Sequence, residues 1–276
     1  MAKLLNGTEL VGYIEERQAR QVRALRQAHR VFPRIVIIKS THASPVIDTY
    51  IRMKQLYGDE ILIESVVETL EDDEMKATIE RYNADASVHG IIVQLPINDI
   101  SRTDEIVNAI APEKDIDGLG INAQYGSATA VAINWLLAGY AIELRGKKIA
   151  LVGRGKLVGA PLEQMWSKAG YNITVIDKHH PDMAGVLRES DIIVTATGVP
   201  RLITAAMVPI GATIIDAGTA SEDGGIVGDV DPGVRERDDI KITPEKGGVG
   251  PLTIAALFDN VIRAASIVAE HNKQDN

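Results

Sequence analysis

Residues 149–161 read IALVGRGKLVGAP, and this stretch decides how the second half of the chain folds. Its apolar start predicts a buried strand, its glycines predict a tight turn, and the residues from Pro161 onward predict a helix. Glycines let the backbone approach a pyrophosphate, whose charge is met by amides at a helix N-terminus. We therefore predict a dinucleotide-binding turn whose candidate residues are Gly153, Arg154, Gly155, Val158 and Gly159. An ordinary glycine-rich turn is the alternative, because the spacing is one residue longer than in the commonest fingerprint.

The segments that follow this turn continue to alternate between strand and helix patterns. Further strands are expected near residues 173–176, 191–196, 213–216 and 240–242. This order predicts a doubly wound α/β domain, in which ligands bind at the carboxyl ends of parallel strands. One of these strands leads into Thr197 and Gly198, which are small enough to let a flat cofactor lie close to the backbone.

The N-terminal half shows the same alternation, so the whole chain is expected to be α/β. The apolar run at residues 90–94 is typical of a parallel strand buried on both faces. The spacing of apolar residues predicts further strands over 34–39 and 61–67, and helices over 7–30, 72–82 and 129–140.

Four polar residues in this half are candidates for chemistry. Tyr50 and Lys54 lie four residues apart on a predicted helix, so both can face one substrate, although a solvated helix face has the same spacing. Gln94 ends a buried strand, where a polar amide needs a partner. Asp117 lies in a turn, and the alternative for it is a structural Asx-type turn residue.

Composition and charge exclude several classes of function. The 276 residues contain no cysteine, which rules out disulfides, thiolate zinc sites and cysteine nucleophiles. A net charge of -9 argues against nucleic acid or a membrane as partner. His179 and His180 are adjacent and lack a third ligand, so no metal site is predicted. With no signal peptide or membrane-spanning run recognised, a cytoplasmic protein is expected.

Together these segments resemble the methylenetetrahydrofolate dehydrogenase/methenyltetrahydrofolate cyclohydrolase family. The resemblance covers nearly the whole chain through six ordered motifs: Tyr50-x-x-x-Lys54, GIIVQLP at 90–96, PEKDIDG at 112–118, GRGKLVGAP at 153–161, GDVD at 228–231 and GGVGPLT at 247–253. It implies a catalytic domain of residues 1–122 completed by 252–276, a Rossmann domain of residues 123–251, and a homodimer.

The resemblance also implies roles for individual residues. Lys54 is the general acid/base, Tyr50 orients the folate, Gln94 supports Lys54, and Asp117 binds the pterin. A carboxylate can accept two parallel hydrogen bonds from an aminopyrimidine edge, which suits Asp117. The other folate-binding residues that the motifs imply are Leu95, Pro96, Gly250, Pro251 and Thr253.

The implied reaction is oxidation of 5,10-methylenetetrahydrofolate with NAD or NADP, followed by Lys54-assisted hydrolysis to 10-formyltetrahydrofolate. Three segments depart from the family pattern: Ile47 replaces a serine common in relatives, and residues 127–132 and 244–246 differ. Two alternatives therefore stay open, a dehydrogenase without cyclohydrolase activity and a non-catalytic nucleotide-binding protein.

Asp177 and Lys178 follow the strand 173–176, where many relatives carry a His-Ser pair that helps hold a 2′-phosphate. An acid about 20 residues beyond the glycine turn is the usual partner of a free ribose 2′-hydroxyl. It would also repel a 2′-phosphate, by roughly 3 kcal/mol at about 5 Å and an effective dielectric near 20. We therefore predict NAD rather than NADP. The alternative is that Arg154, Lys156 and Lys178 together accept the phosphate.

Overall fold

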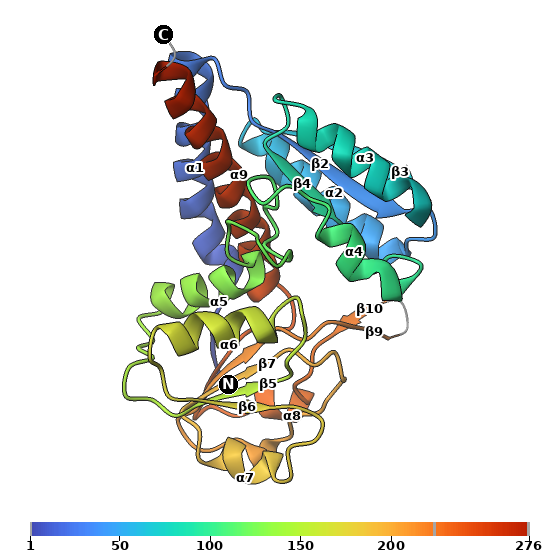
Figure 1. Ribbon diagram of the computed structural model, residues 1–276. Coiled ribbons are helices and arrows are strands. Elements are labelled where there is room, and N and C mark those ends of the chain that lie inside the picture. Colours follow the sequence, from blue (N-terminus) through green and yellow to red (C-terminus); the bar gives the residue numbers. More distant parts are fainter. Residues whose placement is uncertain (1, 223–224, 275–276) are drawn as a thin grey trace. The chain divides into compact units, whose positions relative to one another are not determined.

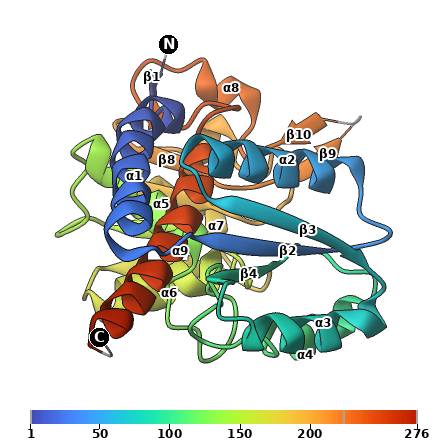
Figure 2. The same cartoon turned by 90° about the horizontal axis from the view of Figure 1, so that it is seen from above.

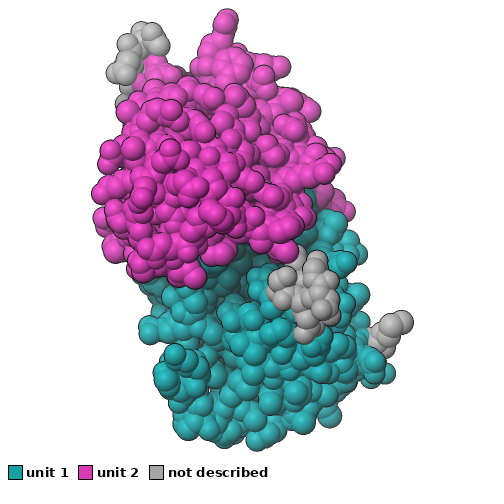
Figure 3. All heavy atoms as spheres, turned by 90° about the vertical axis from the view of Figure 1, so that its right-hand side faces the viewer, with its two compact units in different colours: residues 1–11, 129–253 teal, residues 12–128, 254–276 magenta. Residues whose placement is uncertain are grey.

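The computed structural model describes residues 2–222 and 225–274, and the chain forms two compact units (Figure 3). Unit 1 consists of Met1–Val11 and Thr129–Thr253, and unit 2 of Gly12–Ala128 and Ile254–Asn276. Two long helices, α1 (Gly7–His29) and α9 (Val249–Gln274), contribute residues to both units.

Unit 1 contains a six-stranded sheet in the order β1-β11-β8-β7-β5-β6, and all its neighbouring strands are parallel. β5 lies between β6 and β7, so the winding direction reverses there, which confirms the predicted doubly wound sheet. Ligands of such sheets bind outside the carboxyl ends of the strands at this reversal. The strands are β1 (Lys3–Leu4), β5 (Ile149–Val152), β6 (Ile173–Ile176), β7 (Ile192–Thr195), β8 (Thr213–Asp216) and β11 (Lys241–Ile242).

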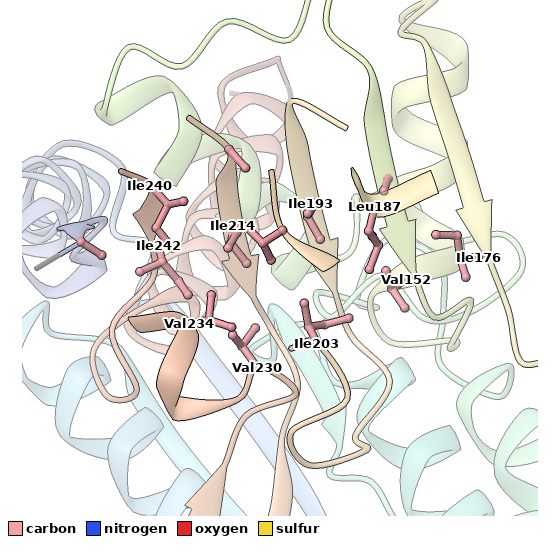
Figure 4. Packing of buried hydrophobic residues seen from close by; sticks show 14 residues of the cluster. Val152, Ile176, Leu187, Ile193, Ile203, Ile214, Val230, Val234, Ile240 and Ile242 are labelled. Atoms are coloured by element: carbon pink, nitrogen blue, oxygen red, sulfur yellow. The ribbon is translucent and has the colours of Figure 1, made fainter. Parts of the chain in front are cut away.

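The other elements of unit 1 connect and cover these strands. They are α5 (Ala128–Gly139), α6 (Gly159–Lys168), α7 (Met183–Arg188), η2 (Ala205–Met207), α8 (Pro232–Arg235) and an antiparallel hairpin of β9 (Ala220–Glu222) and β10 (Gly225–Val227). Figure 4 shows the core that results, in which Val152, Ile193 and Ile214 from neighbouring strands pack with Leu187 of α7 and Val234 of α8. This buried layer holds the strand ends in fixed positions.

Unit 2 is built on a three-stranded parallel sheet in the order β3-β2-β4 (Figure 1). Side chains alternate between the faces of a strand, and Val36 and Ile38 of β2 pack with Met75 and Ile79 of α3. The opposite face of the sheet is covered by α2 (Figure 2). The elements are β2 (Arg34–Ser40), α2 (Pro45–Glu60), β3 (Glu64–Leu70), α3 (Asp72–Ala84), β4 (Gly90–Val93), η1 (Ile100–Arg102) and α4 (Thr103–Val107).

Two details differ from the sequence expectations. The strand expected over 61–67 runs from Glu64 to Leu70, because the turn that ends α2 extends through Leu62, whose φ is 65°. The predicted domain bounds differ too, because residues 123–128 belong to unit 2, residues 252–253 to unit 1, and the first eleven residues to unit 1 rather than to the predicted 1–122 segment. The cause for the first eleven residues is a two-residue strand, β1, whose backbone pairs with β11 far along the chain.

One helix segment, Val249–Lys273, is long and apolar enough to cross a membrane by length and composition, among the residues that the structure describes. In its most apolar window, 67% of the residues are buried inside the structure. Burial of this kind is typical of a core helix.

Candidate active site

Lys54 lies on the buried face of α2. The buried positions of this helix include Ile47, Ile51, Lys54 and Gly58, which recur at the interval of an amphipathic helix. The helix therefore places one ammonium group in a row of otherwise apolar positions, where only 8% of Lys54 stays exposed. A lysine is rarely buried to this extent unless it is paired.

The partner of Lys54 is Gln94, which follows the buried strand β4. The backbone N–H of Gln94 donates to the carbonyl of Ile38 at 2.8 Å, and its side-chain Nε2 donates to the carbonyl of Leu95 at 3.3 Å. The amide oxygen Oε1 then accepts a hydrogen bond from Lys54 Nζ at 2.8 Å. Two predicted site residues that are far apart in sequence are thus in direct contact. The Leu95–Pro96 peptide bond that follows is cis.

Burial lowers the pKa of Lys54, because removing an ammonium group from water disfavours its charged form. The negative charge of Asp117 opposes this effect and raises the pKa. Desolvation is the larger of the two contributions, so Lys54 gives up its proton more readily than an exposed lysine.

Asp117 lies in a loop held by its neighbour Asp115. The buried Asp115 carboxylate accepts backbone hydrogen bonds from Gly118 at 3.0 Å and Gly120 at 2.7 Å. The turn-forming role considered for Asp117 therefore belongs to Asp115. Asn260 of α9 adds a second anchor, because its Nδ2 donates to the carbonyl of Ile116 at 2.8 Å.

The pKa of the Asp117 carboxyl group is shifted by opposing contributions. Desolvation raises its pKa, the Lys54 ammonium lowers it, and the nearby charge of Asp115 raises it again. Lys54 and Asp117 thus each favour the charged form of the other. Tyr50, one turn before Lys54, is half-buried, and desolvation raises the pKa of its hydroxyl, which keeps it protonated.

In unit 1, the three glycines of the predicted turn have different surroundings. A Cβ at Gly153, where φ is 94°, would lie 2.7 Å from the carbonyl oxygen of Ala196. A Cβ at Gly159 would lie 2.1 Å from the carbonyl oxygen of Gly153. Gly155 has nothing within 4 Å of its Cβ position. Internal packing therefore explains two glycines, while the third leaves open space beside the backbone, as a bound pyrophosphate requires.

The carboxyl end of β7 is fixed by a buried acid, Asp229, from the GDVD motif. Its Oδ2 accepts from Thr195 Oγ1 at 2.6 Å and from the backbone N–H of Thr197 at 2.7 Å. This brace holds Thr197 and the exposed Gly198 at the strand end, beside the position where a dinucleotide would bind.

The remaining predicted cofactor residues lie at or near the ends of β5 and β6. Val158 caps α6, and Arg154 is exposed and hydrogen-bonded to Glu163 of α6. Asp177 and Lys178 are exposed after β6, and the Asp177 carboxylate accepts from the backbone N–H of His179 at 2.9 Å. Within residues 2–222 and 225–274, no cluster of three His, Cys, Asp or Glu side chains could hold a metal ion.

Three of the predicted folate-binding residues, Gly250, Pro251 and Thr253, belong to the first turns of α9 in unit 1. The Thr253 hydroxyl donates to the carbonyl of Val249 at 3.2 Å. Sequence reasoning missed Asp115, Asn260 and Glu163. For Asp115, the repeated acid and glycines of DIDGLG were a usable turn signal, whereas Asn260 and Glu163 carry none.

A doubly wound unit with an open glycine turn, and a second unit with a buried lysine–glutamine pair, define a dinucleotide-dependent enzyme. Two family models match: residues 5–117 match the tetrahydrofolate dehydrogenase/cyclohydrolase catalytic domain, and residues 127–269 match the NAD(P)-binding domain of the same name. The chain belongs to the tetrahydrofolate dehydrogenase/cyclohydrolase family, as its motifs predicted. It is an NAD(P)-binding enzyme with the two activities of that family.

Similar proteins cover almost the full chain. A protein from Halothermothrix orenii named Bifunctional protein FolD is 34% identical over 279 residues, which cover 96% of this chain and 98% of that protein. The bifunctional FolD structure from Campylobacter jejuni has a TM-score of 0.89 at 32% identity, covering 97% and 100% of the two chains. A FolD structure from Trypanosoma brucei, complexed with NADP and an inhibitor, has a TM-score of 0.88 at 28% identity, covering 97% and 98%.

Proposed function

We propose that unit 2 binds 5,10-methylenetetrahydrofolate and that Lys54 moves the protons during hydrolysis to 10-formyltetrahydrofolate. The observation that carries this proposal is the contact between Lys54 Nζ and Gln94 Oε1, at 2.8 Å in a buried setting. A general base works best when its pKa lies near the working pH, and burial moves Lys54 in that direction.

When bound, a nicotinamide dinucleotide would supply the hydride acceptor that oxidation of the methylene group requires. Gly153, Gly155 and Gly159 would hold its pyrophosphate, with Thr197 and Gly198 at the neighbouring strand end. These residues would position the dinucleotide and would not form covalent bonds to it.

In the hydrolysis step, water attacks the methenyl carbon and neutral Lys54 takes one proton from it. The bond from that carbon to N5 of the folate then breaks, and Lys54 returns the proton to N5. The second proton of the water is released to solvent as the formyl oxygen forms. Gln94 orients Lys54 throughout, because its amide oxygen is the acceptor for Nζ.

Asp117 would accept hydrogen bonds from the aminopyrimidine edge of the pterin, and Tyr50 would orient the ring. The loop supports this role, because Asp115 and Asn260 hold the backbone on both sides of Asp117 without using its carboxylate. Leu95 and Pro96, which directly follow Gln94 in unit 2, are further residues that we propose contact the folate.

One spectrophotometric assay tests the reaction. With 5,10-methylenetetrahydrofolate and the dinucleotide, we expect methenyltetrahydrofolate to form and decay. Accumulation without decay would indicate a dehydrogenase alone, which is the alternative that Ile47 raises. No reaction at all would leave a nucleotide-binding protein.

We propose that the enzyme prefers NAD to NADP. Asp177 is exposed at the end of β6, where an acid can accept from the ribose 2′-hydroxyl and repel a 2′-phosphate. The test compares kcat/KM for the two dinucleotides at fixed ionic strength in the parent and in Asp177→Ser. The parent should favour NAD, and the substitution should improve the use of NADP. A parent that prefers NADP would mean that Arg154, Lys156 and Lys178 accept the phosphate.

We also propose a homodimer in the cytoplasm, with neither nucleic acid nor a membrane as partner. β6 forms one edge of the six-stranded sheet, where a second copy can add contacts, and the net charge of -9 disfavours anionic partners. Light scattering on the purified protein tests the dimer, since a mass near 29.8 kDa would indicate a monomer.

A further inference from the structure

Arg154, between the first two glycines of the turn, is engaged by a carboxylate that the sequence did not single out. Its Nε donates to Glu163 Oε2 at 2.6 Å, and its NH2 donates to Glu163 Oε1 at 3.3 Å. Glu163 therefore binds Arg154 in a bidentate manner, with one hydrogen bond to each carboxylate oxygen. Glu163 lies in the first half of α6, and its side chain is 24% exposed against 61% for Arg154. The acid is therefore the more buried partner, and it binds the more exposed guanidinium.

A second acid acts on the same guanidinium. The pKa of Arg154 is raised first by the hydrogen bond and charge of Glu163, and further by the charge of Asp177. Asp177 is therefore close enough to influence Arg154, although it follows a different strand. The arginine in the glycine turn is therefore bound by one carboxylate and stabilised in its charged form by a second acid.

We propose that Glu163 is a specificity-determining residue, which excludes a 2′-phosphate from the dinucleotide site by occupying the guanidinium of Arg154. A guanidinium binds phosphate and carboxylate through the same forked pair of N–H groups. A 2′-phosphate must therefore displace Glu163 before Arg154 can bind it. A free 2′-hydroxyl needs no such displacement. This inference rests on the proposed dinucleotide site.

The mechanism differs from repulsion by Asp177 alone, so it makes a separate prediction. Replacing Asp177 leaves Arg154 still paired with Glu163, and NADP use then improves only in part. Glu163→Gln keeps the shape of the side chain but removes its charge, which frees Arg154. We expect this single change to tighten binding of a 2′-phosphate by about tenfold, equivalent to about 1.4 kcal/mol.

The experiment measures binding without folate and without catalysis. Isothermal titration of the full chain with 2′,5′-ADP and with 5′-AMP, in phosphate-free buffer of fixed ionic strength, isolates the contribution of the 2′-phosphate. Glu163→Gln should tighten the binding of 2′,5′-ADP and leave the binding of 5′-AMP unchanged. The matched control is Glu189→Gln, which removes the same charge from another exposed ion pair, with Lys148, in unit 1.

A second pair of variants separates occupation of Arg154 from simple repulsion by Glu163. In an Arg154→Gln background, Glu163→Gln should no longer tighten the binding of 2′,5′-ADP. Glu163 acts through Arg154, and that background lacks the guanidinium. An equal gain in both backgrounds would overturn the inference, as would a gain in the Glu189→Gln control or no gain in Glu163→Gln. If the parent binds neither 2′,5′-ADP nor 5′-AMP, the proposed dinucleotide site itself fails.

Discussion

Lys54 in unit 2 and Arg154 in unit 1 are both cations at proposed ligand sites, but their surroundings are opposite. Lys54 is buried and donates to a neutral amide oxygen. Arg154 is exposed, with one carboxylate bound to it and another nearby. Burial lowers the pKa of Lys54, whereas the acids raise the pKa of Arg154.

This difference separates two uses of positive charge. A cation that must exchange protons needs an environment that destabilises its charged form, which a neutral partner in a buried position provides. A cation that must stay charged needs compensation, and the compensating acids then control which anions can approach it. Single substitutions can change one of these environments at a time.

The largest effect is expected for Lys54→Met. The change removes the proton-transfer group, so cyclohydrolase turnover should fall by about 10² to 10⁴-fold. Binding of 5′-AMP should not change, because the glycine turn is untouched. Lys76→Met, which removes an exposed lysine of α3, serves as the control. Hydrolysis at the parent rate in Lys54→Met would show that another group moves the proton.

Asp117→Ala should weaken the use of folate. Loss of a charge-assisted hydrogen bond to the pterin should raise KM and lower kcat/KM. The corresponding loss of transition-state stabilisation is roughly 1.5 to 3 kcal/mol. Steady-state kinetics with varied folate measures this change. An unaltered KM would assign pterin recognition to a different residue.

Alanine substitutions at two glycines of the turn in unit 1, Gly159 and Gly155, should have different effects. Gly159→Ala should lower the free energy of unfolding by about 1 to 3 kcal/mol, because its Cβ meets the carbonyl oxygen of Gly153. Gly155→Ala should leave the stability unchanged but weaken 5′-AMP and dinucleotide binding, because its Cβ enters open space. Denaturant unfolding and titration calorimetry measure the two properties. Equal binding of dinucleotide by Gly155→Ala and the parent would place the pyrophosphate elsewhere.

The smallest effect is a shift of the pH profile in Asp117→Asn. Hydrolysis needs neutral Lys54, so its rate rises with pH through the pKa of that residue. The Asp117 charge raises this pKa, and its removal should move the midpoint of the normalised kcat/KM profile to lower pH. A midpoint that moves to higher pH would contradict the proposed coupling.

Much of the fold could be predicted because its signals are local. The strands of unit 1 are short apolar runs, and the turn at residues 153–159 is marked by three glycines, of which packing requires Gly153 and Gly159. β1 could not be found in this way, because two residues are too few for a pattern and its partner β11 lies far along the chain. The placement of residues 1–11 depended on that pairing.

The candidate site, like the fold, could be predicted where its residues carry local sequence signals. Lys54, Gln94 and Asp117 could be named from motifs, and helix spacing related Tyr50 to Lys54. The brace from Asn260 to the carbonyl of Ile116 could not be foreseen, since an asparagine within an apolar helix carries no sign of its partner.

The sequence by itself determined which groups are available: one lysine on a helix face, one amide at a strand end, and an arginine between glycines. Only the tertiary structure decided their chemistry. Burial and a neutral acceptor 2.8 Å away lower the pKa of Lys54, and a carboxylate on α6 occupies Arg154. Proton affinity and ion pairing depend on distance and solvent access, and both are set by contacts between segments that the order of residues does not display.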